Sequence, residues 1–198
     1  MKKIILLSAI VILLFSSMAV GQFTAEVSPA ETVFQGRKQG LAYLGIYDNV
    51  SSLVGGFRCG IGGYTDASIR FGLLDYKRFD NGFMFGGDLR YQLMELRIND
   101  PVDLSVGGLF EYSRVSSSNS YSLGGLVVGS RNIGITDDMD LWPFARLILR
   151  WDKYPGDSKF NLGFNPGVSL ELSERTLVTG EFQFDDSFGF IMAIVFGL

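Results

Sequence analysis

The feature that most constrains this chain is a two-residue alternation of side-chain type, which is plainest in residues 187–198. Large apolar residues occupy every second position there: Phe188, Phe190, Met192, Ile194, Phe196 and Leu198. Most of the residues between them are small. Because a β-strand sends successive side chains to opposite faces, this stretch predicts a strand with one bulky apolar face.

The same alternation recurs along the chain, with short polar turns between the segments and almost no helical periodicity. The further predicted strands cover residues 40–47, 53–64, 68–76, 83–93, 104–113, 121–131, 140–152, 160–173 and 176–185. The fold class is therefore all-β. We predict a closed antiparallel barrel of ten strands in up-and-down order. Eight strands remain the alternative if residues 40–47 and one other weak segment are not strands.

The amino terminus has the parts of a secretory signal peptide over residues 1–21. Two lysines precede an apolar run at 4–15, and the small residues Ala19 and Gly21 fit a cleavage site. The run is too short to cross a bilayer comfortably, so we predict export and cleavage rather than a retained anchor. Residues 22–39 show no sustained period and are predicted to be a loosely structured leader. The barrel then covers residues 40–198.

The closing stretch that ends at Leu198 resembles the last strand of bacterial outer-membrane β-barrels. In that family alternate residues of this strand are hydrophobic and the final residue is usually aromatic, so Leu198 departs from the pattern at one position. The resemblance implies an outer-membrane location and contact of the apolar face with lipid. It also implies recognition of the closing strand by the barrel-assembly machinery.

Alternation alone does not say whether the apolar faces point inward or outward. A soluble β-sandwich or lipocalin-like barrel has them inside, whereas a membrane barrel has them outside. Three features favour the membrane barrel: the export signal, the lack of helical spans, and apolar faces rich in Phe, Leu and Tyr. A closed barrel also pairs every backbone group, which the interior of a bilayer requires.

Composition excludes several classes of function. The chain has no histidine and a single cysteine, Cys59, so a disulfide framework and a multi-cysteine metal site are excluded. Outer-membrane proteases, phospholipases and lipid A deacylases use a catalytic histidine, so their mechanisms cannot be carried over. With a net charge of −4 and no basic patch, nucleic acid is not an expected partner. We expect no enzyme activity and no cofactor.

The barrel lumen is where the sequence predicts functional residues. Charged residues opposite the apolar faces are expected to line it: Arg58, Arg70, Asp88, Arg90, Glu111, Arg146, Arg150, Glu171, Glu181 and Asp185. In a narrow interior these charges should pair, because an unpaired buried charge is costly. We predict a salt-bridged, nearly closed lumen. A small porin-like channel for ions or solutes and a surface adhesion barrel remain alternatives, although short loops offer little area for a large partner.

Overall fold

The computed structural model describes residues 27–77, 81–136, 139–185 and 188–198, so the predicted signal peptide lies outside the described residues. The elements in this part of the chain are β1 (Lys38–Tyr47), β2 (Val50–Gly62), β3 (Thr65–Tyr76), β4 (Gly82–Met94), η1 (Leu96–Ile98), β5 (Asp103–Val115), β6 (Ser118–Ser130), β7 (Ile133–Thr136), β8 (Met139–Tyr154), β9 (Asp157–Ser173), β10 (Thr176–Phe184) and β11 (Phe188–Gly197). No helix among the described residues is long and apolar enough to cross a membrane.

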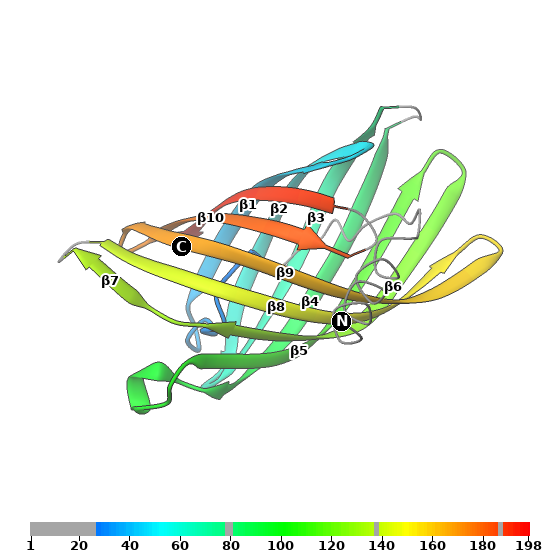
Figure 1. Cartoon of the computed structure of the whole chain (residues 1–198). Helices are drawn as coiled ribbons and strands as arrows, with labels where there is room; N and C mark the ends of the chain where they lie inside the picture. The colour runs from blue at the N-terminus through cyan, green and yellow to red at the C-terminus, as the bar shows by residue number, and fades with distance from the viewer. Residues whose placement is uncertain (1–26, 78–80, 137–138, 186–187) are drawn as a thin grey trace, which may run out of the picture.

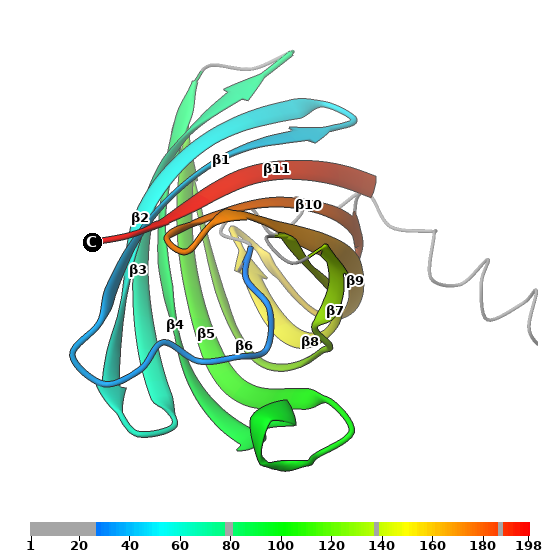
Figure 2. The ribbon, with the colours of Figure 1, turned by 90° about the vertical axis from the view of Figure 1, so that its left-hand side faces the viewer.

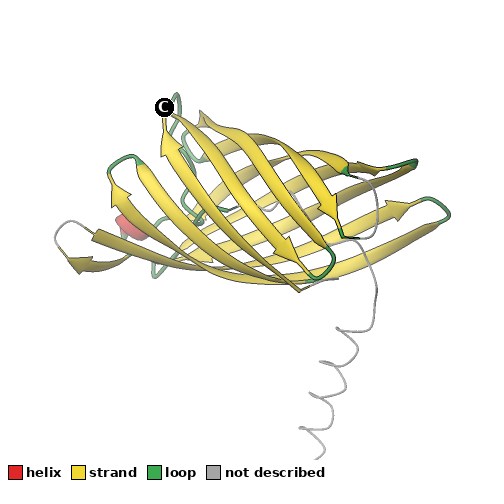
Figure 3. Cartoon of the chain, turned by 90° about the horizontal axis from the view of Figure 1, so that it is seen from above, coloured by secondary structure: helices red, strands yellow, loops and turns green. Residues whose placement is uncertain are grey.

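All the strands except β7 close into a ring of ten (Figures 1 and 2). Chain neighbours pair antiparallel from β1 to β6, β6 pairs with β8, and the order continues to β11, which pairs with β1. Neighbouring strands run side by side with a common tilt, so that the strands of the near and far walls cross in the view of Figure 3. The prediction of a closed up-and-down barrel of ten strands is confirmed, and the eight-strand alternative is wrong.

The two ends of the barrel differ in their connections. We call the end where β1 begins and β11 ends the terminal rim, and the other end the opposite rim. The terminal rim carries η1 and the β7–β8 hairpin. β7 continues the register of β6 along β8, because Ser130 pairs with Phe144 and Ile133 with Leu141. This extension was not predicted, because it is short and follows a polar break at residues 131–132.

The alternation of the sequence becomes an alternation of inside and outside. On β11 the side chains of Met192, Ile194 and Phe196 are 56%, 43% and 40% exposed, whereas Ile191, Ala193 and Val195 are at most 3% exposed. The ring strands repeat this pattern, so most of the large exposed residues of the wall are Phe, Leu, Ile, Tyr or Val. The apolar faces therefore point outward.

Pro166 lies inside β9 without displacing it. A proline cannot donate a ladder hydrogen bond, so the sequence predicts a bulge or kink there. The register of β9 with β10 is nevertheless the same on both sides, since Gly167 pairs with Glu181 and Phe164 with Phe184. The expected bulge is therefore absent, although the pairing with β10 is interrupted at residues 165 and 166. The register shift between these strands lies instead at residues 176–177.

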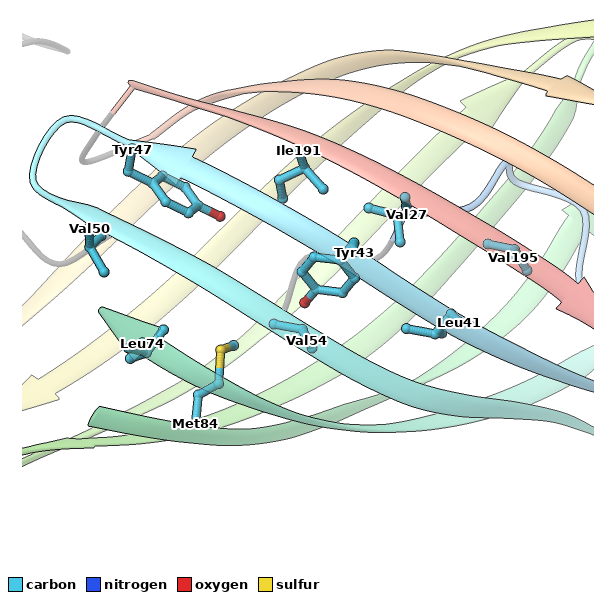
Figure 4. Packing of buried hydrophobic residues seen from close by; sticks show 11 residues of the cluster. Val27, Leu41, Tyr43, Tyr47, Val50, Val54, Leu74, Met84, Ile191 and Val195 are labelled. Atoms are coloured by element: carbon cyan, nitrogen blue, oxygen red, sulfur yellow. The ribbon is translucent and has the colours of Figure 1, made fainter. Parts of the chain in front are cut away.

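The inward faces are not uniformly polar. An apolar cluster inside the barrel joins β1, β2 and β11 to the ends of β3 and β4 at the opposite rim (Figure 4). It contains Val27, Leu41, Tyr43, Tyr47, Val50, Val54, Leu74, Met84, Ile191, Ala193 and Val195. The sequence hinted at this cluster, because apolar residues occupy both faces of β1. It gives the seam between the two ends of the ring a packed interior.

The segment before β1 enters the barrel. The sequence predicts a loose leader over residues 22–39, yet Val27, Ala30 and Val33 are buried to 7% exposure or less. Figure 2 shows this blue segment crossing the mouth of the barrel. The wall begins at Lys38 rather than residue 40. A segment without strand periodicity thus forms part of the interior.

Candidate functional site in the barrel lumen

A first group of paired charges lies near the terminal rim, on β2, β3 and β4. Arg58 contacts Asp66 at 2.5 Å and Asp88 at 2.8 Å, and Arg70 contacts Asp88 at 2.5 Å. Arg90 contacts Asp66 at 2.6 Å. All five side chains are at most 2% exposed, so three guanidinium groups and two carboxylates neutralise most of one another's charge away from water.

A second group spans the middle of the lumen, on β8, β9 and β10. Arg146 Nη2 lies 3.1 Å from Glu181 Oε2, and both side chains are fully buried. Nearer the opposite rim, Arg150 contacts Asp152 at 2.7 Å and Asp185 at 3.2 Å. Neighbouring amides complete the group: Asn165 and Gln183 donate to Glu181, and Asn161 donates to Asp152.

The two remaining predicted lumen residues lie in different surroundings. Glu111 is 4% exposed on the inward face of β5. Glu171 is half-buried and lines a cavity at the terminal rim. The structure thus places Glu171 at the lumen entrance and the other charges deeper inside.

Glycines make room for the arginines. Gly56 and Gly86 flank Arg70 on its neighbouring strands, Gly107 lies opposite Arg90, and Gly124 lies opposite Arg150. An added Cβ at Gly107 would collide with the backbone carbonyl of Leu89, and one at Gly124 would lie 2.5 Å from the carbonyl oxygen of Leu149. The wall therefore has no room for a Cβ at these two positions beside inward-pointing guanidinium side chains.

Buried lumen side chains bind the backbone of residues 29–33. The carbonyl of Pro29 accepts from Arg90 Nη1 at 2.8 Å, and that of Glu31 accepts from Nη2 at 3.4 Å. The N–H groups of residues 30, 32 and 33 donate to Ser130 Oγ, Gln92 Oε1 and Asp66 Oδ2, each at 2.9 Å. Arg90 and Asp66 therefore form an ion pair with each other and also hydrogen-bond to the backbone of residues 29–33.

Open space remains at both ends of the lumen. A cavity of about 550 Å³ lies at the terminal rim, beside the segment, and its charged lining includes Glu31, Arg97, Glu171 and Arg175. A smaller cavity of about 240 Å³ lies at the opposite rim and is lined by neutral residues, among them Tyr76, Ser113, Asn119 and Tyr154. The buried charges lie between these two entrances.

Several residues of the site were missed from the sequence. Asp66 was assigned to a turn, although it shares parity with Arg70 and strand β3 begins at Thr65. Asp152 shares parity with Arg146 and Arg150, so its alternation alone would have placed it inside. Gln92 accepts a hydrogen bond from Thr32, which lies 60 residues away in the chain, and no local sequence pattern predicts this contact.

The described residues contain no cluster of three or more Cys, Asp or Glu side chains arranged to hold a metal ion.

Comparison with known proteins gives matches among solved structures only. The KdgM porin has 10% identity and a TM-score of 0.44, with 80% of this chain and 98% of that chain covered. The outer membrane channel COG4313 from Pseudomonas putida F1 has 10% identity and a TM-score of 0.48, with 87% and 100% covered. The N-terminal β-barrel domain of Pseudomonas aeruginosa OprF has 10% identity and a TM-score of 0.40, with 83% and 98% covered. No family model and no curated protein matches the chain.

Proposed function

We propose that this protein is an integral outer-membrane barrel whose lumen is closed at rest by paired charges and by the segment before β1. The observation that carries the proposal is the inverted distribution of side chains, with apolar residues exposed on the wall and charges buried inside. Soluble monomers rarely expose contiguous apolar surface on this scale. Lipid removes the cost of that exposure.

Strand length supports the same location. The ring strands contain between 9 and 17 residues. About 9–11 tilted residues cross the hydrocarbon core of a bilayer. Export by the predicted signal peptide and recognition of β11 by the barrel-assembly machinery belong to the proposal. Amino-terminal sequencing of the envelope protein should begin at Gln22 or within a residue or two.

The lipid-facing wall is tested by matched isoleucine substitutions. Ile194 lies in β11 and Ile135 in β7, outside the ring, and the two are 43% and 52% exposed. Ile194→Arg should lower the free energy of unfolding in lipid vesicles by about 2–4 kcal/mol. Ile135→Arg should change it by less than about 0.5 kcal/mol. Equal, small effects at both positions would show that β11 does not face lipid.

The closed lumen is tested by conductance in planar bilayers. The parent protein should show rare and small openings, because its buried charges are paired and its entrances do not meet. Arg146→Ala removes volume and orphans Glu181, so conductance should rise. Steady conductance in the parent that Arg146→Ala leaves unchanged in size would contradict the closed lumen.

A small porin-like channel is the second candidate, and the two cavities favour it. They approach the buried charges from both rims, and the larger one has a charged lining. A channel of this kind would conduct steadily in the parent. Changing Arg146 would then alter ion selectivity more than conductance.

A further inference from the structure

The contacts of residues 29–33 have the character of a peptide-binding site. Five main-chain groups are bound, and three of the partners come from three different strands: Asp66 on β3, Gln92 on β4 and Ser130 on β6. Arg90 donates to two carbonyl groups that lie two residues apart, those of Pro29 and Glu31. Main-chain recognition of this kind holds a chain largely through its backbone. The Thr32 hydroxyl adds one side-chain contact, because it also donates to Gln92 Oε1.

One side chain of the segment is recognised by shape. Ala30 is fully buried and packs into an apolar pocket formed by Leu109, Leu126, Val128 and Ile148. The pocket walls come from β5, β6 and β8 and leave the methyl group no exposed surface. The site therefore requires a small residue between the two backbone positions that Arg90 holds.

Three further side chains of the segment, those of Pro29, Thr32 and Val33, are also buried, and Thr32 Oγ1 donates to Gln92 Oε1 at 2.9 Å. Glu31 and Phe34 lie nearer the surface. Glu31 contacts Arg97 at 3.0 Å, but the side chain of Arg97 is 60% exposed. Phe34 is 43% exposed and lies under the guanidinium groups of Arg37 and Arg97. The cavity of about 550 Å³ runs alongside the segment, so the segment can be reached from the terminal rim.

We propose that the terminal end of the lumen is an exchangeable binding site for a polypeptide segment, which residues 29–33 occupy in cis. The ligand class is a short peptide stretch that bends at a residue with an alanine-sized side chain, at the position of Ala30. When the segment of the chain itself leaves, Arg90, Asp66, Gln92 and Ser130 present the same donors and acceptors to a segment of another polypeptide. This property is independent of whether the lumen conducts.

The experiment measures binding of a fluorescently labelled peptide, VSPAETVFQG, to the full mature protein in detergent micelles by fluorescence anisotropy. Two variants displace the segment in cis. Ala30→Trp is too large for the apolar pocket, and Thr32→Pro removes both the N–H and the hydroxyl group that donate to Gln92 Oε1. Heat-modifiable gel mobility reports whether each variant keeps the folded barrel.

The peptide should bind the folded variants at least about tenfold more tightly than the parent, because a tethered segment competes at high effective concentration. Peptides with Ala30→Trp or Thr32→Pro should lose that binding. A peptide with Glu31→Gln should retain it within about threefold, because Glu31 binds through its backbone carbonyl. Affinity for the folded variants no higher than for the parent would overturn the proposal, as would binding of the Ala30→Trp peptide.

Discussion

The lumen contains two regions that are equally buried and are stabilised by different physics. Near β2–β4 and β8–β10 it is filled by arginines and carboxylates in pairs, whereas along β1 and β11 it is filled by the apolar cluster. A charged pair depends on both of its members, because removing one leaves the other unsolvated. An apolar residue leaves only a cavity that its neighbours partly fill. The charged region should therefore be more sensitive to single changes and more tolerant of paired ones.

The largest effect is expected from Arg146→Ala. Glu181 would keep two amide donors but lose its counter-charge, which should lower the free energy of unfolding by about 4 kcal/mol. Urea titration in lipid vesicles measures this value. The double variant Arg146→Leu/Glu181→Leu should recover at least half of the loss. A double variant as unstable as the single one would show that the pair contributes net stability rather than mutual neutralisation.

The apolar cluster should respond to volume alone. Met84 is fully buried there, so Met84→Ala should lower the free energy of unfolding by about 3 kcal/mol through lost contacts and a residual cavity. Met84→Leu keeps most of the volume and should cost less than about 1.5 kcal/mol in the same titration. If the leucine variant lost as much stability as the alanine variant, the cluster would depend on side-chain shape rather than filled volume.

Gly107 and Gly108 are adjacent, and comparing them distinguishes a local need for space beside Arg90 from a general preference for glycine in the strand. Gly107 pairs with Arg90. Gly107→Ala should lower the free energy of unfolding by about 2 kcal/mol, because the new Cβ would collide with the backbone carbonyl of Leu89. At Gly108 the nearest atom to an added Cβ is the Gly124 carbonyl oxygen at 3.8 Å, so Gly108→Ala should be neutral or slightly stabilising. Similar unfolding free energies for the two variants would contradict the requirement for space beside the arginine.

The smallest effect should come from pH. Burial raises the pKa of Glu31 above 4.5, while the nearby Arg97 lowers it and Asp103, Glu95 and Glu171 raise it further. The docked segment favours the protonated form of Glu31. The stability that this protonation contributes is therefore fully present below pH 4.5 and is lost as pH rises through the raised pKa. Relative to Glu31→Gln, the parent should lose stability between pH 4 and pH 8, in the direction that the raised pKa sets. A loss of equal size in both proteins would assign the pH dependence to other groups.

Much of the wall follows from local pattern, whereas its interior contacts do not. A period of two predicted ten strands and placed Arg58, Asp88, Arg146 and Glu181 each opposite the apolar face of its own strand, since strand geometry alone decides which side chains share a face. The alternation does not show which charged side chains pair with one another. Arg58 bridges Asp66 and Asp88 because β2, β3 and β4 lie side by side in a fixed register.

What the sequence alone determined is therefore the all-β alternation, the order of the ten ring strands and the opposition of apolar and charged faces. Only the tertiary structure decided that β6 pairs with β8 past β7, that glycines lie beside arginines, and that residues 29–33 return into the lumen. The segment has no period because it belongs to no strand. Its stabilising contacts join residues 33 to 100 positions apart, and such contacts exist only after the ring has closed.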